Sequence, residues 1–246
     1  MKGFTDLKKH LDLFQKNREK ALLPSPSNRE EYAKVIGECF LPSAKRILSG
    51  QFIVTSNDGG RVVLRTIKPT AIELYYHEED EAGFKDPIMY HTHYRKHPGQ
   101  SMYFERRGIA YLPYFPIGAL NPHSSGVDVT FENPEQKYRA SFLIREYLIS
   151  FDGGKALSIK NSTDIYDDML ISGIPLDGTD WIEWVDGKDF DSIEVVQDWR
   201  RNVPDYIEVT PGNWEKNSQA EGKDSFTIGG YRFVKCPFKW QFRVKK

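Results

Sequence analysis

Residues 72–76 read IELYY and residues 141–147 read SFLIREY, and these two runs decide the fold. Each has the aliphatic and aromatic character of a strand, with a charged residue inside it. A charge inside a buried strand requires a partner, because an unpaired charge is very costly to bury. We therefore predict that Glu73 of the first run faces Arg145 of the second run across a sheet.

The composition limits the class of protein. The chain has 246 residues, enough for one large domain or two small ones. Aromatic residues make up 13%, which favours strands and aromatic-lined pockets over a helical bundle. The formal net charge is −1 at pH 7, so a nucleic-acid site must be a local basic patch. The residues available for such a patch are Arg95, Lys96, Arg106, Arg107, Lys137 and Arg139.

Cysteine content and hydropathy bear on location. Cys39 and Cys236 have no neighbour at a metal-ligand spacing and do not make a disulfide framework, which favours a reducing compartment. No apolar run approaches the roughly 18 residues that a membrane span requires. The N-terminus lacks the hydrophobic region of a signal peptide. We expect a cytoplasmic protein that is monomeric and has no membrane partner.

The first part of the chain has helical periodicity. Apolar residues at helical spacing predict a helix over 4–20, and a second helix is expected to begin near Arg29. Pro42 is expected to end that helix, and Ser43 to cap a short third helix over 44–48.

Strand patterns follow and indicate an antiparallel meander. Asn57, Asp58, Gly59 and Gly60 predict a hairpin turn, because these residues tolerate positive φ. Strands are expected at 51–55, 61–67, 71–76, 108–116, 126–132 and 138–147. The predicted fold class is α+β, with a curved, mostly antiparallel sheet and helices around it. We assign residues 1–28 to an N-terminal helix and linker, and residues 29–246 to a single domain.

Five features occur in a fixed order between residues 40 and 150. They are a helix that leads into a strand at 40–54, the triplet Glu73-Leu74-Tyr75, a histidine after an acidic loop (His91 or His93), the aromatic segment 108–121, and Leu143-Ile144-Arg145. Their order resembles the alkyladenine (3-methyladenine) DNA glycosylase family, of which the chain would be a divergent member. The resemblance is strongest over residues 40–150. We assign the whole of 29–246 to one glycosylase-like domain.

The resemblance implies a fold and an activity. The fold would be a barrel like the C-terminal domain of formyltransferases. The activity would be excision of alkylated or deaminated purines, by base flipping and water attack on the N-glycosidic bond. The partner would be double-stranded DNA with a damaged base. No metal and no organic cofactor would be required.

The resemblance also implies roles for individual residues. Glu73 would be the general base that activates water, and Arg145 would keep Glu73 ionised and hold the water or a phosphate. His91 or His93 would join the same polar network.

Other residues would bind the DNA and the flipped base. Tyr75 and Tyr111 would stack the base, and Asn121 would contact the purine edge. Tyr114 or Phe115 would be the wedge that fills the gap in the duplex.

Three other interpretations remain open. Glu73 and Arg145 fit a structural cross-strand ion pair equally well. A non-catalytic protein on the same scaffold would bind a nucleobase, a nucleotide or a protein partner. A metal-dependent hydrolase would use His91, His93 and His97 with the nearby acids Glu78, Glu79, Asp80 and Asp86, since histidines two apart in a strand point to one side.

Overall fold

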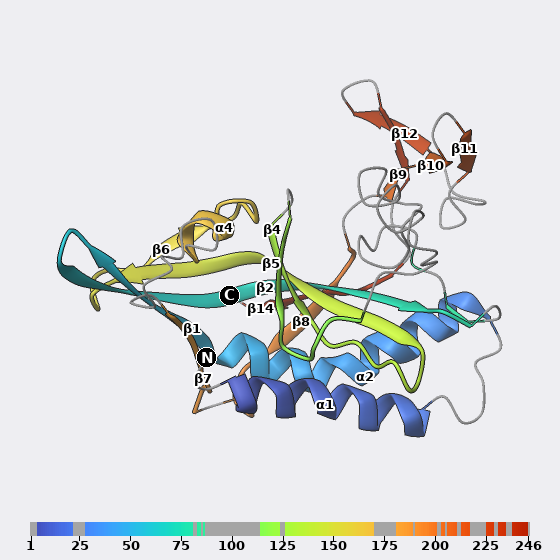
Figure 1. Cartoon of the computed structure of the whole chain (residues 1–246). Coiled ribbons are helices and arrows are strands. Elements are labelled where there is room, and N and C mark those ends of the chain that lie inside the picture. The colour runs from blue at the N-terminus through green and yellow to red at the C-terminus, as the bar shows by residue number, and fades with distance from the viewer. Residues whose placement is uncertain are drawn as a thin grey trace.

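The chain folds as an α+β structure, as the sequence predicts (Figure 1). The computed structural model describes residues 4–21, 28–80, 83–84, 86, 114–123, 126–169, 181–188, 190–200, 203–204, 206–210, 213–216, 225–228, 231–234 and 238–245. Helices α1 (Phe4–Ala21) and α2 (Arg29–Ser49) lie together on one face of a curved sheet. The described helices include none that combines the length and hydropathy needed to cross a membrane.

The main sheet has nine strands, and every described pairing in it is antiparallel. The order is β3-β4-β5-β2-β1-β7; β14 pairs with β2 and β8, and β6 pairs with β5. The strands are β1 (Gln51–Asp58), β2 (Arg61–Glu78), β3 (Leu120–His123), β4 (Gly126–Thr130), β5 (Tyr138–Phe151), β6 (Leu157–Ile159), β7 (Trp181–Val185), β8 (Val195–Asp198) and β14 (Gln241–Val244).

The remaining described elements are short. Helix α4 (Ile165–Asp168) lies on the side of the sheet opposite α1 and α2 (Figure 1). One small sheet pairs β10 (Tyr206–Thr210) with β11 (Asn213–Lys216). A second small sheet joins β12 (Ser225–Ile228), β13 (Tyr231–Val234) and β9 (Val203–Pro204).

The longest strand pairing in the sheet joins β2 to β5. The length of β2 corrects the prediction of two separate strands in this region. Strands expected separately at 61–67 and 71–76 form one continuous strand. Pro69 cannot donate a ladder hydrogen bond. The register instead shifts between Pro69 and Ala71 and again between Ala71 and Ile72, so an irregularity absorbs the proline without ending the strand.

The β1–β2 hairpin turn is confirmed. Gly59 and Gly60 both have positive φ, at 58° and 90°, which suits a two-residue turn between twisted strands.

The expected helix break at Pro42 is wrong, because α2 continues through this residue to Ser49. Phe40, Ala44 and Ile47 flank the proline and are fully buried, so packing holds the helix where propensity alone would end it. Ser43 does not cap a new helix; its hydroxyl donates to the carbonyl oxygen of His10 in α1 at 2.6 Å.

Strand alternation divides the two faces of the sheet. Ile72, Leu74 and Tyr76 of β2 belong to the core cluster that α1 and α2 cover. The residues between them, Glu73, Tyr75 and His77, point to the opposite face, since successive strand side chains alternate. Buried residues of α1 share this core, so the N-terminal helix packs on the sheet rather than standing apart.

Candidate functional site

The face of the sheet opposite α1 and α2 carries the candidate site. We call it the polar face, and its members on β2, β4 and β5 are Glu73, Tyr75, His77, Asp128, Thr130, Arg139, Ser141, Leu143 and Arg145. On β4 the alternation is the same as on β2, because Val127 and Val129 enter the core and Asp128 lies between them.

The predicted pairing of Glu73 with Arg145 is confirmed. Glu73 is directly opposite Leu143 in the β2–β5 ladder, so Arg145 is its diagonal neighbour. Arg145 Nε forms an ion pair with Glu73 Oε2. The Glu73 side chain has no exposed surface, whereas 17% of the Arg145 side chain is exposed. The Glu73 end of the pair is therefore buried, and the Arg145 end partly reaches solvent.

A contact beyond the pair fixes the outer end of Arg145. Its Nη1 donates to Ser162 Oγ at 3.3 Å. Ser162 belongs to the turn that precedes α4, so the guanidinium joins β2, β5 and this turn.

Asn121 lies on the polar face but away from Glu73. Register places Asn121 opposite Asp128, Asp128 opposite Leu143, and Leu143 opposite Glu73. Asn121 is thus three strands from Glu73, or roughly 14 Å at the usual spacing of about 4.8 Å between strands. The two side chains share a row without direct contact, and Asp128 and Leu143 separate them.

Tyr75 is buried beside the ion pair. It packs on Leu143, and the Arg200 guanidinium lies 5.2 Å from its ring centroid. Arg200 in turn binds Asp86 through two hydrogen bonds, of 2.6 and 3.1 Å. Such a bidentate pair is among the strong charged contacts and holds Arg200 against the tyrosine.

The predicted wedge residues are tied to a second ionic cluster. The Tyr114 ring lies 4.1 Å from the Arg139 guanidinium, and the Phe115 backbone N–H donates to Glu132 at 2.8 Å. Arg139 also pairs with Glu79 at 2.5 Å and with Glu132 at 3.4 Å. Burial raises the pKa of the Tyr114 phenol, and the neighbouring Glu79 carboxylate raises this pKa further. Tyr114 is therefore half-buried and held on Arg139 rather than carried on an exposed tip.

The two described members of the expected basic patch differ. Arg139 is fully buried in its ionic cluster, so it is not available to a DNA phosphate. Lys137 is exposed and pairs with Asp80 at 3.1 Å.

Several predicted residues lie outside the described part of the chain. They are His91, His93, His97, Tyr111, Arg95, Lys96, Arg106 and Arg107. Within the described residues, no group of three or more His, Cys, Asp or Glu side chains could hold a metal ion. The acids proposed as metal ligands have other partners there, since Glu78 binds Arg18 and Asp86 binds Arg200.

Sequence reasoning missed Asp128, Ser141, Ser162 and Arg200. Asp128 carries the same signal that marked Glu73, a charge between apolar residues in the strand GVDVT. Ser141 is fully buried, and its hydroxyl has no hydrogen-bond partner among the described residues. Arg200 joins the site from 114 positions beyond Asp86, which no local pattern could have indicated.

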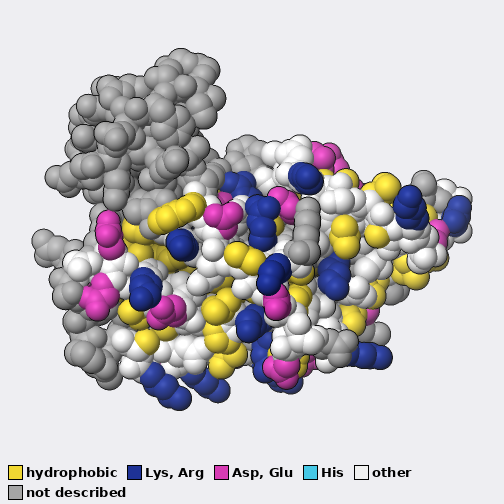
Figure 2. Space-filling model, turned by 180° about the vertical axis from the view of Figure 1, so that it is seen from behind, with side chains coloured by type: hydrophobic (Ala, Val, Ile, Leu, Met, Phe, Trp, Pro, Cys, Tyr) yellow, Lys and Arg dark blue, Asp and Glu magenta, His cyan; other side chains and the backbone are white. Residues whose placement is uncertain are grey.

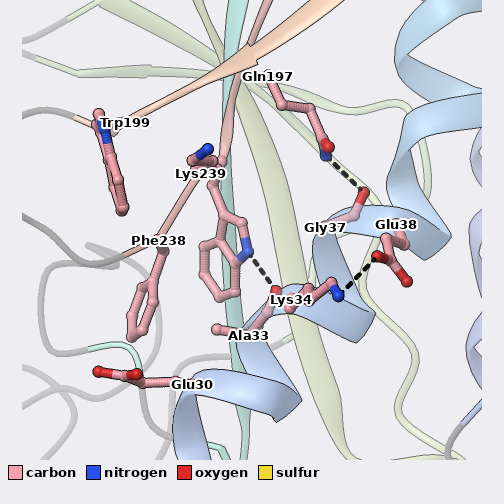
Figure 3. A pocket seen from close by; sticks show the side chains of 10 residues that line it. Glu30, Ala33, Lys34, Gly37, Glu38, Gln197, Trp199, Phe238 and Lys239 are labelled. Carbon is pink, nitrogen blue, oxygen red and sulfur yellow. Dashed lines mark hydrogen bonds and ion pairs between the residues drawn. The ribbon is translucent and has the colours of Figure 1, made fainter.

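A groove lies on the other side of the sheet, between α2, the end of β8 and the segment 238–240 that leads into β14 (Figure 3). It has a volume of about 380 Å³, and none of the predicted site residues lines it. Trp199 is 54% exposed at its edge, with Lys239 Nζ 5.2 Å from its ring centroid. The floor is fixed, because Trp240 Nε1 donates to the Ala33 carbonyl oxygen at 2.8 Å.

In comparisons with known proteins, no family model, no curated protein and no solved structure matches the chain. The likeness to alkyladenine DNA glycosylases therefore depends on the order of motifs in the sequence.

Proposed function

We propose that the protein is a DNA glycosylase-like hydrolase that releases alkylated or deaminated purines from double-stranded DNA. The observation that carries the proposal is the buried carboxylate of Glu73, which Arg145 holds on the polar face of the sheet. A general base must be held where it can accept a proton from water, and the ion pair with Arg145 fixes the position of this carboxylate. The same proposal includes the barrel fold of the resembled family. It also includes the site roles given above to His91, His93, Tyr111, Asn121, Tyr114 and Phe115.

The proposed reaction is hydrolysis at C1′ of the flipped nucleotide. Glu73 accepts one proton of a water molecule as the water oxygen attacks C1′. The bond between C1′ and the purine nitrogen breaks, and its electron pair goes to the departing base. A neutral purine then takes up the proton that Glu73 received, whereas a cationic alkylated purine leaves as the neutral base and Glu73 returns its proton to solvent. Tyr75 stacks the base, and Arg145 orients Glu73. The products are a free purine and an abasic site.

A non-catalytic binding function is the second candidate, and burial favours it. Glu73 has no exposed surface and Tyr75 has almost none, so neither reaches solvent in this conformation. Glycosylase activity therefore requires the polar face to open for a nucleotide. A protein that binds a nucleobase, a nucleotide or a partner elsewhere would retain the ion pair for structural reasons alone.

The deciding experiment is single-turnover base release from duplexes that carry hypoxanthine, ethenoadenine or 7-methylguanine. Loss of a general base lowers rates by about 10² to 10⁴, and we expect this loss in Glu73→Gln with duplex binding retained. Glu146→Gln is the matched control, because Glu146 is also ion-paired on β5 but to Arg243, at 3.4 Å. Its rate should stay near that of the wild type.

The opposite result is equally informative. If the wild type releases no base and its duplex binding shows no salt dependence, the glycosylase proposal is wrong, because phosphate contacts always release counterions. Titration with free nucleobases and nucleotides would then test the binding function.

A further inference from the structure

The turn before α4 contacts the candidate catalytic pair through Ser162. Arg145 uses Nε for Glu73 and Nη1 for Ser162 Oγ, the latter at 3.3 Å. A guanidinium is planar and presents its donors in a fixed fork. Two contacts on different nitrogens therefore fix the orientation of the whole group, whereas the Glu73 contact alone would leave it free to rotate.

The position of Ser162 is itself set by its neighbours. Asn161 Nδ2 donates to Asp164 Oδ1 at 2.7 Å, and the Thr163 N–H donates to Asn161 Oδ1 at 3.3 Å. Such bonds between a side chain and nearby groups are typical of rigid turns. Ile165, at the start of α4, is fully buried. The turn is thus anchored on both sides of the serine hydroxyl.

Gly126, the first residue of β4, allows this turn to approach the sheet. A Cβ at this position would lie 2.6 Å from the Ser162 carbonyl oxygen, and the glycine has φ of 136°. Both the close approach and the backbone conformation require the absence of a side chain. The β3–β4 hairpin and the turn therefore meet only because residue 126 is glycine.

We infer that Ser162, placed by its contact with Gly126, is a positioning residue that orients Arg145 toward Glu73. The contact chain runs from Gly126 through Ser162 and Arg145 to the carboxylate. Its effect on base release rests on the proposed function, whereas its effect on Arg145 does not. Small displacements matter at such a site, since a 1 Å misplacement can cost about 100-fold in rate.

The first test reads the guanidinium directly. Hydrogen exchange of the Arg145 Nε–H would be followed by ¹⁵N NMR, with the signal assigned by its loss in Arg145→Lys. In Ser162→Ala we expect exchange to accelerate roughly tenfold, the effect of losing one hydrogen bond to a charged group. Ser162→Thr keeps a hydroxyl and should restore protection. Wild-type protection in Ser162→Ala would overturn the inference.

Two glycine variants separate the contact from backbone strain. Gly126→Ala and Gly153→Ala both place a side chain at positive φ, but nothing lies within 4 Å of a Cβ at Gly153, where φ is 74°. Only Gly126→Ala should lose Arg145 protection. Equal effects of the two variants, compared under conditions where both are folded, would show that strain rather than displacement of Ser162 is responsible.

Base release is the second readout, and it keeps the two proposals apart. If the wild type releases base, Ser162→Ala should be slower by roughly tenfold at unchanged duplex affinity, and Ser162→Thr should recover. A rate equal to the wild type would overturn the positioning role alone. If the wild type releases no base, the glycosylase function fails, and the Nε–H exchange still decides whether Ser162 orients Arg145.

Discussion

The two faces of one sheet have opposite chemistry. On the helix-covered face, rings of Phe14, Phe40 and Phe131 pack edge-to-face or stacked in a continuous apolar core. On the polar face, Glu73 pairs with Arg145, and Arg139 pairs with Glu79 and Glu132. Both sets are buried, but they differ in what burial yields. Apolar burial stabilises in proportion to area, whereas a buried ion pair barely offsets the cost of desolvation.

The contrast indicates that the helix-covered face supplies most of the stability of the fold, whereas the buried charges of the polar face add little to it. Hydrophobic residues of similar volume would serve stability at least as well as the buried charges do. On the face of the main body that Figure 2 shows, basic and acidic side chains are interspersed rather than gathered by sign.

The largest expected effect is a loss of stability when a core aromatic residue of the helix-covered face is truncated. Phe40 contacts rings from α1, β14 and the segment after β4. Phe40→Ala should lower the free energy of unfolding by about 3–5 kcal/mol, the usual cost of truncating a core aromatic. Urea denaturation at pH 7 would measure it.

Leu143→Ala is the matched truncation on the polar face. Leu143 clusters only with Tyr75 among the described buried residues, so its loss should cost about 2 kcal/mol, the low end of the range for leucine. An equal or larger loss in Leu143→Ala would mean that the polar face carries as much of the stability as the core.

The fold was predictable from the sequence where local pattern and burial agree. The charge inside each apolar run, IELYY and SFLIREY, predicts that the two strands pair and that Glu73 contacts Arg145, and both are present. The expected helix end at Pro42 and the expected gap between strands 61–67 and 71–76, where Pro69 lies, are both wrong because tertiary packing outweighs the local penalty of a proline. In each case the chain absorbs the missing N–H within a long element that is buried on one side.

The site was less predictable because its members come from distant parts of the chain. Asp128 shares the alternation signal of Glu73 and could have been found in this way. Ser162 and Gly126 could not, since their contact depends on how the turn before α4 meets the β3–β4 hairpin. A serine in a loop carries no local signal of a contact with an arginine on a neighbouring strand.

A smaller effect distinguishes two hydroxyls on the polar face. Thr130 and Ser141 are directly paired across β4 and β5. Thr130 Oγ1 donates to the Pro116 carbonyl oxygen at 3.0 Å, whereas Ser141 Oγ has no partner among the described residues. Thr130→Val should cost about 1 kcal/mol or more, and Ser141→Ala should be neutral or stabilising.

Urea denaturation of the two variants measures this difference. A destabilised Ser141→Ala would mean that its hydroxyl is satisfied by a group outside the described residues. The Ser141 hydroxyl would then be, like the paired charges of the polar face, a buried polar group with a partner.

The smallest effect concerns Glu78, a charge that reaches the helix-covered side. Burial raises the pKa of Glu78, but hydrogen bonds from Tyr32, Tyr76 and Arg18 outweigh burial, so the pKa lies below the ordinary value of 4.5. The Arg18 and Tyr32 bonds are both 2.6 Å long. These donors come from α1 and α2, so Glu78 joins both helices to β2.

The sign of the pH dependence follows from the lowered pKa. Between the folded pKa and 4.5, the unfolded chain binds a proton at Glu78 that the folded chain does not bind. The stabilisation is complete above pH 4.5 and declines as the pH falls through the folded pKa. The stability difference between wild type and Glu78→Gln should therefore shrink below pH 4.5, as urea denaturation between pH 7 and 3 would reveal. Tyr32→Phe removes one donor, raises the folded pKa and should narrow this pH window. A difference that stays constant with pH would mean that the helices contact Glu78 without favouring its charge, and the ionic chemistry would then belong to the polar face alone.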